Sequence, residues 1–159
     1  MLSTKPPISF PGRLHHTVPS WIKQGCYYHI RIRADKCTPF QLIDDTIAKR
    51  LLDSACYYHQ HKHWHCLLIL IMPDHLHAII SFPPNVSMSA TIGNWKRSAS
   101  KFLGIKWQKN FFDHRIRTPD ELSEKYSYIL RNPVVKALCA SENDWPWRWE
   151  QHRSADLEE

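Results

Sequence analysis

The sequence predicts an α+β fold, in which helices cover one antiparallel sheet in the split βαβ order that is also called ferredoxin-like. Three observations support this prediction. The expected elements run in the order strand, helix, strand, strand, helix, strand. Apolar residues alternate in the expected strands and recur every three or four residues in the expected helices. The chain has 159 residues, 43% of them hydrophobic, which suffices for one domain with a substantial core.

The first half of the chain contains three expected strands and one helix. Apolar residues alternate with polar ones over 28–33, which predicts a half-buried strand with a basic outer face. Thr38 precedes a proline, as an N-cap residue often does, so we expect a helix from there to about Tyr57. The apolar segments 64–72 and 76–82 flank a Pro-Asp turn and predict a hairpin.

The second half begins with an amphipathic helix over 88–103, which Gly104 is well placed to cap. A fourth strand region is expected over about 106–117. Thr118 then has the N-cap position of a capping box and predicts a third helix to about Arg131, where Pro133 should end or kink it.

Three segments are expected along the chain. Residues 1–22 are rich in proline and form an N-terminal arm, residues 23–132 form the main domain, and residues 133–159 form a C-terminal tail packed on the same domain. The sequence shows no internal repeat.

Charge and composition narrow the class of protein. A net charge of +6 and a pI near 9.1 favour a polyanionic partner such as nucleic acid. The five cysteines include no Cys-x-x-Cys pair, which argues against a disulfide framework or a cysteine zinc knuckle. No signal peptide is recognisable, and the longest apolar run, residues 66–72, is too short to span a bilayer. We therefore expect a cytoplasmic protein.

Two pairs of polar residues could form one site. His75 and His77 alternate on an apolar strand and so project from the same face. Tyr128 and Asn132 lie one turn apart on the third helix. If that helix face meets the histidine face, two imidazoles and an amide oxygen could hold a divalent ion while the tyrosine hydroxyl attacks a phosphodiester.

These residues resemble a known family. Residues 72–77, Met-Pro-Asp-His-Leu-His, resemble the His-hydrophobic-His motif of the HUH endonucleases. Residues 128–134 resemble the nucleophile helix of the REP-associated tyrosine transposases, relatives of the single-tyrosine transposases of small bacterial insertion sequences. Stretches within 107–117 and 144–147 also fit, so that the resemblance extends from about residue 20 to 150.

The resemblance implies an HUH domain in which His75, His77 and Asn132 bind Mg²⁺ or Mn²⁺ and Tyr128 is the nucleophile. The implied substrate is single-stranded DNA beside a REP-type palindrome folded as a hairpin. Cleavage leaves a 5′-phosphotyrosine and a free 3′-hydroxyl, and rejoining reverses the step. Insertion-sequence relatives usually carry glutamine where Asn132 stands and act as dimers, whereas the REP-associated group implies a monomer associated with the nucleoid.

Other interpretations stay open at this stage. The chain could be a DNA-hairpin binding protein that does not cleave, with a regulatory or structural role, or a zinc hydrolase, although it lacks a His-Glu-x-x-His helix. His75 and His77 could be satisfied core residues, and Asn132 could simply mark a helix end. Tyr126 is a rival nucleophile, but it points about 200° around the helix from Tyr128 and is expected in the core.

Several basic and aromatic residues are candidates for DNA contacts. The basic candidates are Arg31, Arg33, Lys96, Arg97, Lys101, Arg115 and Arg117. The four arginines on the first and fourth expected strands are favoured for contacts with the DNA backbone, because both strands are expected to edge the sheet. Trp147 and Trp149 could stack on bases, although packing of the tail is favoured. The alternating histidines 59, 61, 63 and 65 are expected to hold no metal.

Overall fold

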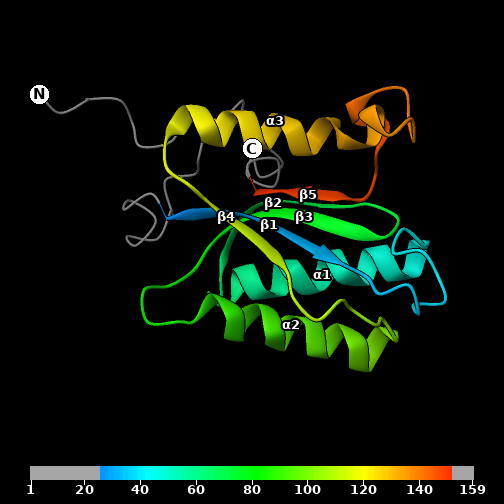
Figure 1. The fold of residues 1–159 in the computed structure, drawn as a ribbon, viewed down its shortest axis with the longest axis horizontal. Coiled ribbons are helices and arrows are strands. Elements are labelled where there is room, and N and C mark those ends of the chain that lie inside the picture. Colours follow the sequence, from blue (N-terminus) through cyan, green and yellow to red (C-terminus); the bar gives the residue numbers. More distant parts are fainter. Residues whose placement is uncertain (1–25, 152–159) are drawn as a thin grey trace, which may run out of the picture.

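A computed structural model describes residues 26–151 and contains one five-stranded sheet with three α-helices (Figure 1). The predicted arm over 1–22 lies outside the described residues. Along the chain the elements are β1 (Tyr27–Arg33), α1 (Asp45–Gln60), β2 (His65–Ile71), β3 (His75–Ser81), α2 (Met88–Leu103), β4 (Phe112–Ile116), α3 (Pro119–Val135), the short 3₁₀ helix η2 (Glu142–Asp144) and β5 (Arg148–Glu150). Within 26–151 no helix is both long enough and apolar enough to cross a membrane.

The sheet confirms the predicted α+β class. Its strand order is β4-β1-β3-β2-β5, and every neighbouring pair is antiparallel. The histidine strand β3 therefore lies in the middle, with β1 on one side and β2 on the other. Strand β5 was not expected, because three residues are too few to show alternation. The fourth strand is shorter than the predicted 106–117 segment, from which Trp107 contributes only an isolated bridge to Ala34.

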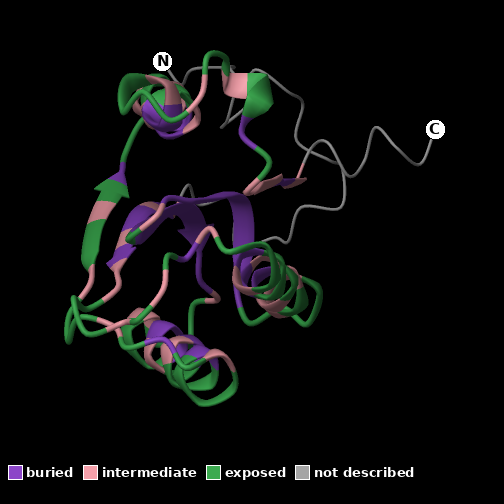
Figure 2. Ribbon diagram, turned by 90° about the vertical axis from the view of Figure 1, so that its right-hand side faces the viewer, coloured by how far each residue is buried: buried purple, intermediate pink, exposed green. Residues whose placement is uncertain are grey.

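Helices cover both faces of the sheet. Helices α1 and α2 lie on one face and α3 lies on the other (Figures 1 and 2). Strands β2 and β3 are buried along their whole length, as expected for strands covered on both sides. Two apolar layers result. The α1–α2 layer includes Ile30, Leu51, Ile69, Ala78 and Trp95, and the α3 layer includes Leu68, Leu70, Ile79, Leu122 and Ile129.

The predicted start of α1 is wrong. The helix begins at Asp45, where the Asp44 carboxylate accepts hydrogen bonds from the backbone N–H groups of Thr46 and Ile47. Thr38 is instead used in a long-range contact: its hydroxyl donates to the carbonyl of Lys106 at 2.7 Å and accepts from the N–H of the same residue at 3.0 Å. The threonine therefore joins two loops and caps no helix.

The predicted bounds of α2 are confirmed. The Ser87 hydroxyl accepts from the N–H of Ala90 at 3.2 Å, which satisfies one of the free donors at the start of the helix. At the other end Gly104 adopts a φ of 71°, the left-handed conformation that glycine enters without the steric cost of a Cβ atom.

Helix α3 starts as predicted but ends later. The Thr118 hydroxyl accepts from the N–H of Glu121 at 3.1 Å, as an N-cap should. At the other end the helix continues through Pro133 to Val135 and not only to about Arg131. The carbonyls of Asn132 and Pro133 accept hydrogen bonds from residues 136 and 138, so the last turn is completed beyond the proline. Asn132 consequently stays on the helix and above the sheet.

Candidate active site

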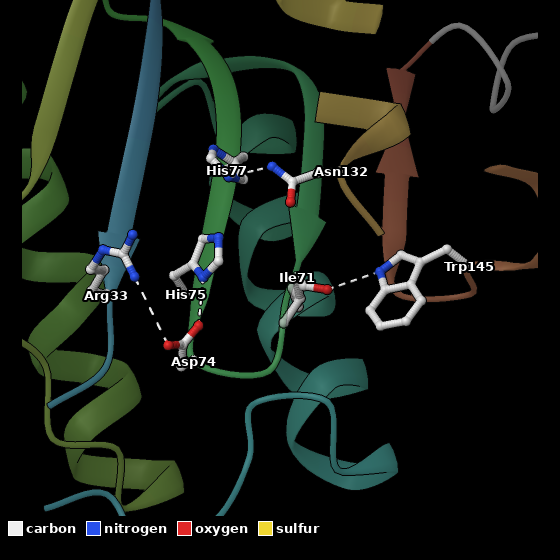
Figure 3. Close-up of polar contacts among 7 residues, drawn as sticks. All are labelled: Arg33, Ile71, Asp74, His75, His77, Asn132 and Trp145. Carbon is white, nitrogen blue, oxygen red and sulfur yellow. Dashed lines mark hydrogen bonds and ion pairs between the residues drawn. The ribbon is translucent and has the colours of Figure 1, made fainter. Parts of the chain in front are cut away.

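The structure brings the histidine strand and the third helix together. His75 and His77 project from β3 toward α3, and His77 is only 1% exposed. The amide nitrogen of Asn132 on α3 lies 3.2 Å from Nε2 of His77 (Figure 3). Both residues are buried, so the contact joins the two layers inside the protein.

Tyr128 lies one turn before Asn132 and faces the same site. Its side chain is 54% exposed, so the phenol is open to solvent. The ring is nearly perpendicular to that of His77, with 6.0 Å between the ring centroids, and lies 6.2 Å from the ring of His29. The four predicted site residues therefore gather around one point, with three of them buried and the tyrosine at the open side.

The rival tyrosine is placed differently. Tyr126 is 1% exposed, and its hydroxyl donates a hydrogen bond to Oε1 of Glu150 at 2.7 Å. Burial raises the pKa of the Tyr126 phenol well above its ordinary value. Glu150 is also paired with Arg148, whose Nε lies 3.2 Å from Oε2. Tyr126 thus joins α3 to β5, and its expected place in the core is confirmed.

The second ring nitrogen of His77 has its own partner. Nδ1 of His77 lies 3.0 Å from Nε2 of His29 on the neighbouring strand β1. Because the Asn132 amide donates to Nε2 of His77, the His77 proton resides on Nδ1 and is donated to His29. Burial lowers the pKa of His77 to about 2 and that of His29 to about 4. Both imidazoles are therefore neutral at physiological pH, the state in which a histidine binds a metal.

His75 is oriented in a similar way from the opposite side. Its Nδ1 donates to the carboxylate of Asp74 at 2.6 Å, and that carboxylate also lies 3.9 Å from the guanidinium of Arg33. The hydrogen bond to His75 holds the pKa of Asp74 below its usual value. With Nδ1 occupied, Nε2 of His75 is left as the free acceptor, and it is turned toward His77 and Asn132 in Figure 3.

The imidazoles of His75 and His77 and the amide of Asn132 fit a hard divalent cation. Oδ1 of Asn132 is buried and has no hydrogen-bond partner in the described part of the chain, which is costly for a carboxamide oxygen. Rotation of the amide by a half-turn would bring this oxygen beside Nε2 of His77. The lone pairs of the two atoms could then bind the same cation. Residues 26–151 contain no cluster of three or more His, Cys, Asp and Glu side chains suited to a metal. A site here would therefore depend on the amide oxygen in addition to the two imidazoles.

The site opens into a basic pocket of about 770 Å³. Its lining includes Arg31, Arg33, Lys36 and Lys136 together with His75, His77, Tyr128 and Asn132. Two carboxylates, those of Asp35 and Asp74, also line it. Cationic side chains therefore outnumber carboxylates beside the tyrosine, which favours an anionic ligand.

The other predicted basic contacts are not brought to this pocket. Of the two arginine strands only β4 is an edge strand, since β1 lies between β4 and β3, so the expectation that both form edges is wrong. Side chains alternate along β4, so Arg115 projects from the face of the sheet opposite to that of Phe112 and His114. Arg117 follows the strand, where its N–H is bound by Glu121.

The three basic residues of α2 lie on the other side of the sheet from α3 (Figure 1). The ammonium group of Lys96 donates to the carbonyl of Gln108 at 2.8 Å, and Arg97 donates to the side chain of Asn94. Lys101 is exposed. None of the three is among the residues that line the pocket.

Tryptophans of the tail pack against the domain. The indole N–H of Trp145 donates to the carbonyl of Ile71 at 2.9 Å (Figure 3). Trp147 and Trp149 are partly buried against the apolar layers, and Trp149 pairs with Ile69 through the backbone of β5. The three indoles therefore contact the domain through packing or hydrogen bonds.

The histidine run over 59–65 is divided between two environments. Nδ1 of His59 accepts from the N–H of Cys66 at 3.0 Å, and the ring of His59 lies 4.8 Å from that of His65 and 5.2 Å from that of Trp149. His61 and His63 are exposed; His61 stacks on Tyr57 of α1, and the ring of His63 lies tilted against that of Tyr58. The run therefore does not converge on one point.

Two residues of the site were missed by sequence reasoning. Asp74 immediately precedes His75 in the hairpin turn, but its contact with the ring depends on how the turn folds. His29 is 48 positions from its partner His77. The alternation over 28–33 places His29 on the polar face of its strand, which was the available signal, although it does not say which histidine lies opposite.

The combination of a split βαβ sheet, a two-histidine central strand and a tyrosine helix defines the HUH class that the sequence resemblance implied. Residues 22–126 match the family model described as transposase IS200-like, and the chain belongs to this family. The match ends just before Tyr128 and Asn132.

Two proteins of Haemophilus influenzae are similar to parts of the chain. A Haemophilus influenzae protein that bears the name REP-associated tyrosine transposase is 26% identical over 106 residues, which span 55% of this chain and 60% of the relative. An uncharacterized protein of the same organism is 30% identical over 95 residues, or 42% of this chain and 52% of the relative. The chain thus spans little more than half the length of either.

Among solved structures, a REP-associated tyrosine transposase bound to a REP hairpin superposes with a TM-score of 0.70 at 22% identity. The superposition covers 84% of this chain and 81% of the other. At this identity the comparison establishes the fold, and it confirms the predicted architecture.

Proposed function

We propose that the protein is a metal-dependent DNA strand transferase that cleaves and rejoins single-stranded DNA beside a REP-type hairpin. The single observation that carries the proposal is the convergence of Tyr128, 6.0 Å from His77 between ring centroids, on a buried imidazole–amide pair. A tyrosine nucleophile beside neutral metal-binding groups in a basic pocket is suited to covalent phosphoryl transfer.

In this proposal the Tyr128 oxygen attacks the phosphorus of a phosphodiester. A bond forms between the phenol oxygen and phosphorus, and the bond from phosphorus to the 3′ oxygen breaks. The leaving oxygen gains a proton and becomes a free 3′-hydroxyl, while the tyrosine loses one. Rejoining is the reverse step. Since one phosphodiester replaces another, no nucleotide cofactor is required.

His75, His77 and Asn132 would hold the cation, Mg²⁺ or Mn²⁺, which when bound would polarise the phosphate oxygens. Asp74 and His29 would orient the two imidazoles, as acceptors behind metal-binding histidines commonly do. Arg31 and Arg33 would contact the DNA backbone at the mouth of the pocket.

The proposed partner follows from the basic pocket and from the relatives. The solved structure of similar fold is described as bound to a REP hairpin, and a curated relative carries the REP-associated name. We propose a monomer that acts on chromosomal hairpins in the cytoplasm, with a dimer as the alternative.

The proposal is tested with an oligonucleotide that carries a hairpin and a labelled single-stranded flank. In the presence of Mg²⁺ or Mn²⁺ we expect a band of low mobility on a denaturing gel, which protease treatment converts to a short labelled product. Hairpin binding in a native gel without any covalent band, over a range of flank sequences from the genomic neighbourhood of the gene, would instead identify a non-cleaving hairpin binder.

Replacement of His29 tests its proposed positioning role. We expect His29→Phe, which keeps the ring but removes the acceptor for His77, to raise the Mn²⁺ concentration needed for half-maximal cleavage by about 10- to 100-fold. His29→Gln retains an acceptor and should recover much of this loss. A purely structural role for His29 would lower protein stability in both variants without changing the dependence on Mn²⁺, and that result would contradict the prediction.

A further inference from the structure

Phe112 is an aromatic residue that the proposed chemistry does not use. It lies on the edge strand β4, and its side chain is 41% exposed although its neighbours on the same face are polar or cationic. An exposed phenylalanine on a sheet edge has no stabilising burial to explain it. Its surroundings therefore indicate what could cover the ring.

The backbone register places Phe112 in one row with the site. Phe112 is directly opposite Arg31 on β1, and Arg31 is directly opposite His77 on β3. Two strand spacings, about 10 Å, separate the phenylalanine from the histidine. The ring also meets that of His29 edge-on at 5.7 Å between centroids, and His29 in turn lies 6.2 Å from the ring of Tyr128.

The guanidinium group of Arg31 already lies over the ring of Phe112. The guanidinium carbon of Arg31 lies 4.9 Å from the centroid of Phe112, a cation–π arrangement. Arg31 also lines the basic pocket, so an anionic strand that enters the pocket would pass beside the phenylalanine. A flat aromatic surface next to a phosphate-binding cation is the combination that single-stranded nucleic acids require.

We propose that Phe112, supported by Arg31, is a stacking platform for an unpaired nucleobase close to the phosphodiester that Tyr128 attacks. This inference rests on the proposed function, because it assumes that a DNA strand occupies the pocket. Stacking would hold the strand extended across β4 and β1 while the cationic side chain contacts its backbone. Because every base presents an aromatic face, the platform would position the strand without strong preference for sequence.

A second protein chain is the alternative occupant of this edge. The residues that alternate with Phe112 on the opposite face of β4, Asp113 and Arg115, are charged and exposed, as on strands that avoid edge-to-edge pairing. Charge and geometry therefore favour the nucleobase, and the test below distinguishes the two.

The test uses Tyr128→Phe protein, which should bind without cleaving, and oligonucleotides with 2-aminopurine at successive positions of the single-stranded flank. We expect quenching of the fluorescence at one position, its loss in Phe112→Ala and Phe112→Leu, and its recovery in Phe112→Tyr. Affinity for the flanked hairpin should fall by about 5- to 100-fold in the alanine variant, while a hairpin without a flank should bind unchanged.

Phe102 supplies a matched control. It is also an exposed phenylalanine, 63% accessible, with the ammonium group of Lys101 5.3 Å from its ring, but it lies on α2 on the other side of the sheet. Phe102→Ala should therefore leave both quenching and affinity unchanged. Equal effects of the two alanine variants would overturn the proposal.

The remaining outcomes separate this inference from the proposed function. Covalent cleavage by the wild-type protein together with unchanged quenching in Phe112→Ala would overturn the platform and leave the enzyme intact. Quenching that depends on Phe112 in a protein that forms no covalent adduct would support the platform and contradict the transferase. If Phe112→Ala instead changes the concentration-dependent sedimentation of the protein alone, the edge is an interface between copies, and the platform is wrong.

Discussion

Tyr128→Phe is expected to abolish the covalent protein–DNA adduct while leaving hairpin binding nearly unchanged. The substitution removes only the hydroxyl, so the ring contacts with His77 and His29 are retained. Without the phenol oxygen no bond to phosphorus can form, and cleavage should fall below detection, by at least about 10⁴-fold. Because the side chain is 54% exposed, stability should change by less than about 0.5 kcal/mol. Denaturing gels, native gels and urea unfolding measure the three quantities.

Tyr126→Phe is the matched control for this experiment. It removes the same group two residues away, but there the hydroxyl is buried and donates to Glu150. We expect a loss of about 1–3 kcal/mol of unfolding free energy, because the buried hydrogen bond from Tyr126 to Glu150 is lost. The adduct should persist. A covalent band in Tyr128→Phe that disappears in Tyr126→Phe would reverse the assignment of the nucleophile.

His77→Ala is expected to remove cleavage and metal binding together. The variant deletes the nitrogen beside Asn132 and breaks the contact between β1 and α3 that passes through this ring. Cleavage should fall by at least about 10³-fold, and titration with Mn²⁺ followed by electron paramagnetic resonance should show loss of the bound ion. Chelation of the wild-type protein should have the same effect on cleavage, and added Mg²⁺ or Mn²⁺ should restore it.

His65→Ala controls for the loss of a buried histidine. His65 is buried on the neighbouring strand β2, close to His59 and outside the pocket lining. Its replacement should lower stability by an amount similar to that in His77→Ala, on the order of 1–3 kcal/mol, without loss of the Mn²⁺ signal or of cleavage. Full cleavage by chelated wild-type protein, or equal loss of activity in the two variants, would contradict the metal role of His77.

Much of the fold was predictable because the relevant signals are local. The alternation of apolar residues, the N-cap at Thr118 and the left-handed glycine at 104 each act within a few residues of the chain, and the structure confirms the elements that they predict. The alternation of His75 and His77 likewise follows from strand geometry alone. Local signals failed at Thr38, which found a distant partner in Lys106, and at Pro133, through which α3 continues to Val135.

The sequence by itself determined the antiparallel sheet, the shared face of the two histidines, and the one-turn spacing of Tyr128 and Asn132. Only the tertiary structure decided that these faces meet. It also decided that Tyr126 is buried against Glu150, and that His29 stands behind His77. The physical reason is that the contacts of His77 join residues 48 and 55 positions apart, so they depend on how the layers pack and not on any local preference.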